Sequence, residues 1–463
     1  MDARTRLLLE APIGPTILRL ALPNLVIMLV QASIGLVETY FVGKLGTDAL
    51  AGMALVFPIL MSTQMVSAGA MGGGILTAVA RTLGAGRGQD AYLLAWHAAA
   101  IAFALGLFST LAAFAFGRPL YALMGGHDGS LVAALTYSNF IFAGAIPLWL
   151  FNSLAAVIRG TGNMVVPASV TTVGAIVLIP LSAALIFGWG PIPALGIIGG
   201  AAAVVSFYVV ASGIFAAYIW SGRGVLHPPL RPPRLRWAPT REILRVGAMS
   251  SIVSLSTNIA IATATGFVGM HGAAAVAGYG TGSRLEYMLV PLIFGLGAPL
   301  GALVGTAIGA DRRDRALRIA WTGAAIAGIV AETIGLAAAA APQAWLTLFG
   351  QDSEMIASGS QYLRIVGPFY GFFGIGLALY FASQGAGRMT WPFFAAILRV
   401  IVAVGGGWLA LRLGAGLAGV FAALGAGLAT MGLINVASIA LGAWFGRSAA
   451  RELPAAAPVP QSD

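Results

Sequence analysis

The sequence of 463 residues has no cysteine and few charged residues. The missing cysteines exclude disulfides and cysteine-based metal or redox sites, and they leave the cellular compartment open. Charged residues make up only 9% of the chain, against about 25% in soluble domains, which argues against a large soluble domain. The histidines are isolated near predicted helix ends or in loops and lack metal-ligand spacing, so we expect no metal site and no cofactor. They are His97, His127, His227 and His271.

Apolar residues are abundant instead, at 59% of the chain. A membrane-spanning helix needs about 20 consecutive, mostly apolar residues. The sequence therefore predicts an all-α polytopic membrane protein with twelve transmembrane helices joined by short turns. The twelve runs lie at approximately 14–42, 49–79, 91–116, 131–158, 163–187, 194–220, 242–270, 275–308, 316–340, 355–384, 389–412 and 415–446.

The net charge of +10 follows membrane topology and does not indicate an anionic partner. Along the twelve predicted spans, 19 of the 25 Lys and Arg residues fall in one set of loops and the two termini. The opposite loops hold only Lys44, Arg118 and Arg412. Because Lys and Arg are enriched on the cytoplasmic side, both termini are predicted to be cytoplasmic. Nucleic-acid binding is not expected.

Residues 221–240 form a linker rich in Pro and Arg, which includes the sequence HPPLRPPRLRWAPT. Consecutive prolines hold such a segment extended and semi-rigid. The linker divides the chain near its middle, so we expect an N-terminal six-helix lobe at 1–220 and a C-terminal six-helix lobe at 241–446. Residues 447–463 are predicted to be a disordered cytoplasmic tail.

The two halves resemble each other. Residues 39–52 (TYFVGKLGTDALAG) match residues 265–278 (TGFVGMHGAAAVAG) at a shift of 226. Further along, Gly160 and Gly162 meet Gly385 and Gly387 at a shift of 225. With six helices in each half, both halves enter the membrane from the same side, and a pseudo-twofold axis along the membrane normal relates them. This repeat predicts two bundles that rock about a V-shaped central cavity.

Glu38 lies inside the first apolar run, where a charge costs a few kcal/mol to insert. Gln31 and Asn24 stand seven and fourteen residues upstream, so the three side chains fall on nearly one helical stripe. This stripe predicts the wall of a polar cavity, in which Glu38 and Gln31 bind the coupling ion. Hydrogen bonding between helices is the alternative interpretation, and it is favoured for Asn24.

Several fragments in this order resemble the multidrug and toxic compound extrusion (MATE) family. In the first half they are ETYFVGKLGTDALAG, RTLGAGRGQDA and RGTGNMVVP. In the second half they are VGMHGAAAVAGYGTGSR, LVGTAIGADRRDRA and SQGAGRMTWP. The resemblance covers roughly residues 14 to 446. It implies a secondary antiporter that exports drug-like, often cationic, organic compounds in exchange for H⁺ or Na⁺.

The resemblance places Glu38 where family members commonly have an aspartate that binds the coupling ion. The chain departs from the family in its fifth helix, where residues 172–188 contain Ser182 but no Asn or Asp. At the shift of 226, Glu38 lies opposite Ala264, so the acid is absent from the second half. Sodium needs several oxygen ligands at one point, whereas a single buried carboxylic acid can carry a proton. We therefore expect H⁺ coupling, with Na⁺ as the alternative.

Other polar residues at membrane depth are candidates for the substrate cavity, and each has helix packing as an alternative role. For Glu286 the alternative is an ion pair with Arg364 or Arg399; Glu332 is a weaker candidate. The full set of cavity candidates is Asn24, Gln64, Asn152, Glu286 and Gln384.

Other membrane functions fit the sequence less well. A lipid or lipid-linked-precursor flippase of related fold often has extra helices or a strongly cationic cavity. A channel would show a ring motif or a re-entrant loop, and an enzyme would show a clustered nucleophile and base. None of these is evident, so we expect a monomeric transporter of small organic compounds in a bacterial cytoplasmic membrane, without enzyme activity.

Overall fold

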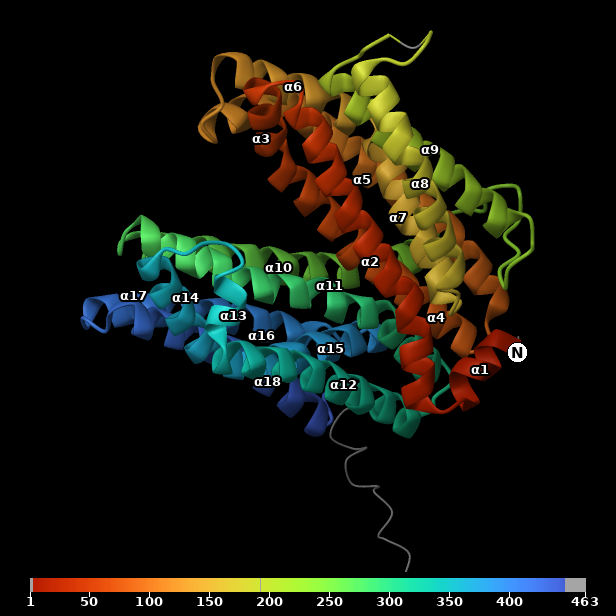
Figure 1. Ribbon diagram of the computed structural model, residues 1–463. Helices are drawn as coiled ribbons and strands as arrows, with labels where there is room; N and C mark the ends of the chain where they lie inside the picture. Colours follow the sequence, from red (N-terminus) through yellow and green to blue (C-terminus); the bar gives the residue numbers. More distant parts are fainter. Residues whose placement is uncertain (1–2, 192, 446–463) are drawn as a thin grey trace, which may run out of the picture.

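The computed structural model of the protein describes residues 3–191 and 193–445. These residues fold into helices joined by short turns (Figure 1). The predicted tail at 447–463 lies outside them. In the first half the helices are α1 (Ala3–Glu10), α2 (Ile13–Gly43), α3 (Thr47–Gln64), the π-helical turn η1 (Met65–Met71), α4 (Gly72–Gly84), α5 (Gly88–Leu123), α6 (Asp128–Ala143), α7 (Ala145–Gly160), α8 (Val165–Phe187) and α9 (Ile197–Trp220).

The second half repeats this pattern after the linker. Its helices are α10 (Trp237–Gly269), α11 (Ala273–Gly309), α12 (Arg313–Ala340), the short α13 (Pro342–Leu346), α14 (Ser353–Val366), the 3₁₀ turn η2 (Gly367–Phe369), α15 (Tyr370–Ala386), α16 (Thr390–Val400), the π-helical turn η3 (Ile401–Gly405), α17 (Gly406–Arg412) and α18 (Gly416–Ala440). Helix α10 begins at Trp237, inside the predicted linker. Pro239 is compatible with this start, because it lies in the first turn, where the missing N–H of proline is not needed.

The prediction of twelve membrane-spanning helices is confirmed. In the part of the chain that the structure describes, eleven helices are long and apolar enough to cross a bilayer. Helices α6 and α7 supply the twelfth span, since they meet at a bend of 49°. Helices α14 and α15 are likewise joined through a short turn, at the corresponding place in the second half.

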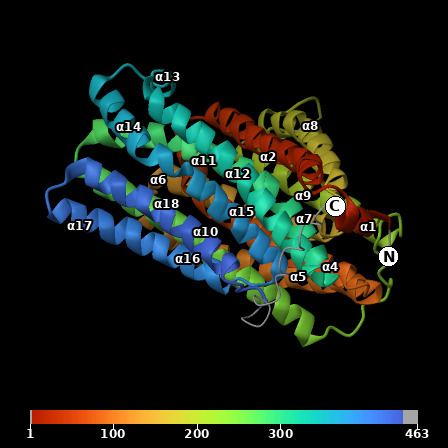
Figure 2. The same ribbon diagram turned by 90° about the horizontal axis from the view of Figure 1, so that it is seen from below.

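The spans form two bundles of six that diverge from a common apex (Figure 1). The N-terminus and α1 lie at this apex, and the far ends of the bundles point apart. Seen from below, the helices of the second bundle lie in front of the first (Figure 2). At the apex, α11 of the second bundle packs against α2 and α4 of the first.

The internal repeat is visible in the backbone. Gly46 precedes α3 with φ 117°, and Gly272 precedes α11 with φ 101°. Gly162 and Gly387, which follow α7 and α15, have φ 80° and 70°. These angles lie in a region that glycine adopts without strain from a side chain. The glycines that revealed the repeat in the sequence are therefore the ones that shape equivalent turns.

The lobes approach most closely through a reciprocal pair of glycines at the apex. A Cβ atom on Gly84 would lie 2.1 Å from the carbonyl oxygen of Thr306, and one on Gly309 would lie 2.0 Å from that of Arg81. The two contacts are related by the same shift of 225 residues that relates the halves. The pseudo-twofold axis therefore passes through this crossing of α4 and α11, where only glycine fits.

We predict that Gly84→Ala and Gly309→Ala destabilise the protein, because the added methyl group meets backbone atoms that cannot move aside. Overpacking of this kind costs about 1–3 kcal/mol. The matched control is Gly266→Ala in α10, where nothing lies within 4 Å of the added atom and alanine favours the helix. Thermal unfolding in detergent compares the three variants. If all three melt alike, the crossing is not a point of closest contact.

Candidate transport site

A cavity of about 630 Å³ lies between the two lobes. Its volume is within the range of pockets that hold drug-sized molecules. Residues of α2, α3, α8 and α9 line one side, and residues of α11 and α15 line the other. Of the predicted site residues, the cavity wall contains Asn24, Gln31, Glu38, Gln64 and Gln384.

Glu38 is buried in the wall of this cavity, with 5% of its surface exposed. It lies five residues before the end of α2. The Ser182 hydroxyl on α8 donates a hydrogen bond of 3.1 Å to its Oε1 atom. Tyr137 and Tyr208 line the same cavity as Glu38. None of the ion pairs among the described residues includes Glu38.

An amide network borders the same cavity. Asn152 Nδ2 donates to Gln64 Oε1 at 2.9 Å and to the Ser67 hydroxyl at 3.1 Å. Gln64 Nε2 in turn donates to the hydroxyl of Tyr208. Gln64 and Tyr208 line the cavity, whereas Asn152 is 2% exposed and stands behind them. The sequence-based placement of Asn152 in the wall is therefore corrected: its contacts fix the orientation of Gln64.

Asn24 and Gln384 join the two lobes. Asn24 on α2 donates through Nδ2 to the Gly295 carbonyl on α11 at 3.1 Å. Gln384 on α15 donates to the Ser250 hydroxyl at 2.9 Å and to the Gly69 carbonyl of η1 at 3.4 Å. Both side chains line the cavity, and both also hydrogen-bond to a backbone carbonyl of the opposite lobe. For Asn24 this matches the hydrogen-bonding role that the sequence favoured.

Glu286 does not line the central cavity, contrary to its sequence-based placement. It lies within the second lobe, where Arg399 pairs with it at 3.5 Å and the Tyr362 hydroxyl donates to it at 2.9 Å. Buried ion pairs of this kind are costly to break, and so this contact draws the carboxylate away from the cavity. Glu332 similarly accepts a hydrogen bond of 2.7 Å from the Gly371 backbone N–H.

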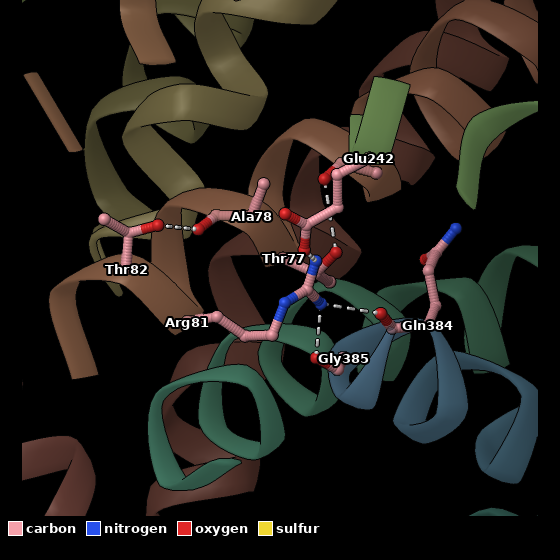
Figure 3. Close-up of polar contacts among 8 residues, drawn as sticks. Thr77, Ala78, Arg81, Thr82, Glu242, Gln384 and Gly385 are labelled. Carbon is pink, nitrogen blue, oxygen red and sulfur yellow. Dashed lines mark hydrogen bonds and ion pairs between the residues drawn. The ribbon is translucent and has the colours of Figure 1, made fainter. Parts of the chain in front are cut away.

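Arg81, near the end of α4, crosses from the first lobe to the second (Figure 3). Its Nη1 donates to the Gly385 carbonyl at 2.7 Å and to the Gln384 carbonyl at 3.3 Å, and its Nη2 pairs with Glu242 at 2.8 Å. The Arg81 side chain is 12% exposed and that of Glu242 is 56% exposed. Because exposed ion pairs contribute little, the partly buried carbonyl contacts contribute more to this cross-link. In the sequence, Arg81 is only one of the Lys and Arg residues that indicate the cytoplasmic side of the membrane.

Helix α1 adds a third connection at the apex. The guanidinium groups of Arg312 and Arg315 donate to the carbonyls of Leu9 and Ala11 at 3.0 and 2.7 Å. Leu8 is buried beside Gly162 of the first lobe. The short helix therefore spans both lobes on the side opposite the mouth of the V.

The description "MatE" belongs to a family model that matches the chain at residues 23–184 and 249–409. The chain belongs to the MatE family of transporters. The two matched segments begin 226 residues apart, at 23 and 249. This offset equals the shift of the internal repeat, so the family pattern occurs once in each half.

Known proteins of this family match most of the chain. The FAD transporter of Shewanella oneidensis is 27% identical over 371 residues, which cover 80% of this chain and 81% of that protein. The probable multidrug resistance protein NorM of Deinococcus radiodurans is 28% identical, with 94% of this chain and 96% of that protein covered. A crystal structure of a MATE protein in the bent conformation aligns with a TM-score of 0.86 at 24% identity over 97% of this chain and 100% of that one. The fold and the membrane transporter class are thereby established.

We predict that Arg81→Gln loosens the apex, because hydrogen bonds made by a charged group are worth about 1.5–3 kcal/mol. A cysteine introduced at Thr77, which is fully buried one helical turn before Arg81 on α4 (Figure 3), reports on this change in a chain without native cysteine. Maleimide labelling of Thr77→Cys in nanodiscs should become about tenfold faster with Arg81→Gln. The control, Arg87→Gln, removes an exposed arginine whose ion pair is with Asp90 of its own helix, and it should leave the rate unchanged. Equal rates in both backgrounds contradict the cross-link.

Proposed function

We propose that this protein is a secondary active antiporter that exports organic, drug-like compounds in exchange for protons. The observation that carries this proposal is Glu38, a carboxylate buried in the wall of a drug-sized cavity without a cationic partner among the described residues. An isolated buried charge is expensive, and a carboxylate avoids that cost by taking up a proton. Binding and release of a proton there changes the charge of the cavity itself.

The surroundings of Glu38 support H⁺ over Na⁺. A sodium site needs several oxygen ligands that converge on one point. The Ser182 hydroxyl donates a hydrogen bond to Glu38, and the Gln64 oxygen already accepts one from Asn152. Gln31 shares the cavity wall with Glu38 and remains our second candidate for the coupling-ion site.

The proposed transport cycle uses the V shape of the molecule. The apex carries the loops rich in Lys and Arg, which we place in the cytoplasm on the positive-inside principle. With both termini cytoplasmic, the cavity opens to the outside in a bacterial cytoplasmic membrane. In this state a proton reaches Glu38 from outside the cell, and the substrate leaves to the outside. Rocking of the two lobes then closes the cavity on the outside and opens it to the cytoplasm.

The lining of the cavity supports a broad range of substrates. Its aromatic residues include Phe207, Phe294 and Phe381, and methionines face the same space. Methionine side chains adapt to different shapes, and aromatic rings offer large apolar faces. One relative is named as a probable multidrug resistance protein and another as a transporter of FAD, a compound with aromatic rings. We propose small organic compounds with an aromatic body, including cationic ones.

We predict that Glu38→Gln abolishes export while the protein remains folded, since the second half has Ala264 at the equivalent place. Glu38→Asp should retain part of the activity because it keeps the carboxylate. The matched control is Glu332→Gln, in which the amide oxygen can still accept the bond from Gly371, and this variant should export normally. Drug accumulation in an efflux-deficient host measures activity, and size-exclusion profiles measure folding. Normal export by Glu38→Gln refutes its role as the coupling site.

We predict that an imposed pH gradient alone drives substrate uptake into proteoliposomes in sodium-free buffer. The physical reason is that one carboxylic acid can bind and release a proton without a set of converging ligands. Uptake is followed by substrate fluorescence, with Glu38→Gln liposomes as the control for leakage. Uptake that needs a sodium gradient and ignores pH assigns the coupling to Na⁺ instead.

A further inference from the structure

Arg159 lines the same cavity as Glu38. It is the last residue but one of α7, at the apex end of the lobe. Its Nε donates to the carbonyl of Ala155, one helical turn back, at 3.4 Å. Side chains of a helix point towards its N-terminus, and this contact shows that Arg159 follows that direction. The guanidinium group therefore reaches from the helix end towards the interior of the cavity.

Arg159 differs from two other arginines at membrane depth. Arg81 pairs with Glu242, and Arg399 pairs with Glu286. Among the residues that the structure describes, no acidic side chain forms an ion pair with Arg159. An arginine stays charged in proteins, and a charge inside a membrane protein is expensive unless it has a partner or a function. Within the described part of the chain the guanidinium group of Arg159 therefore has no acidic partner, which leaves it available to a bound anion.

The internal repeat shows that the fold does not require a cation at this place. At the shift of 225, the counterpart of Arg159 is Gln384, a neutral side chain that also lines the cavity. The counterpart of Glu38 is Ala264. Both unpaired charges of the cavity are therefore confined to the first lobe, with Glu38 near the open end of the V and Arg159 at its closed end.

We propose that Arg159 forms a subsite for an anionic group of the transported compound, so that substrates include organic phosphates and other organic anions with an aromatic body. This inference rests on the proposed export function and names a substrate class for it. The planar guanidinium group binds phosphate or carboxylate through two parallel hydrogen bonds. Tyr208 and Phe381 line the same cavity and offer rings for the aromatic part.

A pair of flavins that differ only in a phosphate group tests this subsite. Riboflavin and riboflavin 5′-phosphate are titrated by flavin fluorescence against the full-length protein in phosphatidylcholine nanodiscs, without any ion gradient. The wild type should bind the phosphate form about tenfold more tightly, as expected for charge-assisted hydrogen bonds. Arg159→Gln, which introduces the residue of the other half, should bring this ratio close to one and leave riboflavin affinity unchanged.

Two further variants sharpen the result. Arg159→Lys should keep part of the preference, because it retains the charge but loses the planar pair of donors. Arg87→Gln, which removes an exposed arginine outside the cavity, should keep all of it. The ratio is measured at equilibrium without an ion gradient, so it remains informative even if proton-coupled export fails its own tests.

Three results overturn the proposal: equal affinity of the wild type for both flavins, no binding of either flavin, or a preference that survives in Arg159→Gln. A lipid headgroup could supply the same anionic chemistry, so the titration is repeated with phosphatidylglycerol in the nanodiscs. A preference that persists in this lipid supports the substrate subsite. A preference that vanishes in this lipid assigns Arg159 to the headgroup and overturns its role in substrate binding.

Discussion

The cost of a charge at membrane depth governs the arrangement of polar residues in this protein. Most such groups are satisfied within the chain: Glu286 by Arg399 and Tyr362, and Glu332 by the Gly371 backbone. These contacts lie inside the second lobe and hold its helices together. Glu38 and Arg159 form no ion pair with any residue that the structure describes, and both face the cavity. The charges that hold the second lobe together are thus separate from the two charges that line the cavity.

The contacts between the lobes are of two kinds. The crossing of α4 and α11 is symmetric, since Gly84 and Gly309 each lie against the backbone of the opposite helix. The polar cross-links are not symmetric: Arg81 holds carbonyls of α15, but its counterpart at position 306 is a threonine. A rocking motion can keep a glycine crossing as its pivot, because small residues let helices slide and tilt at close range. The polar contacts must break for the apex to open, and they therefore set the stability of the closed apex.

Much of this fold was predictable from the sequence. Twelve apolar runs gave the spans because a bilayer imposes a minimum length on each helix. The glycines of the repeat were informative because a turn with a positive φ angle favours glycine, and the same turn therefore has a glycine in both halves of the sequence. Glu38 stood out because an acid is rare in an apolar run. The structure was needed for groups whose partners lie far away in the chain.

Arg81 and Arg159 illustrate this limit. In the sequence both are arginines at the predicted cytoplasmic ends of spans, and both count equally towards topology. The partners of Arg81 lie 161 and 304 residues away. The residues next to Arg81 in the sequence therefore do not predict these contacts. Arg159 has no ion pair with an acidic side chain in the described part of the chain, and this depends on the packing of distant segments. The same holds for Glu286, for which the sequence offered Arg364 and Arg399 equally; the packing of the second lobe pairs it with Arg399.

The confinement of both unpaired charges to one lobe constrains how an exporter of this design can release its cargo. If the lobes rock as rigid bodies, Glu38 and Arg159 keep their separation, and a compound that spans them keeps both contacts in either orientation. Rocking changes only its contacts with the opposite lobe, where the wall consists of side chains such as Phe294 and Phe381. In the transport cycle that we propose, protonation of Glu38 adds a change in the first lobe itself, so that contacts on both sides of the cavity differ between the two states.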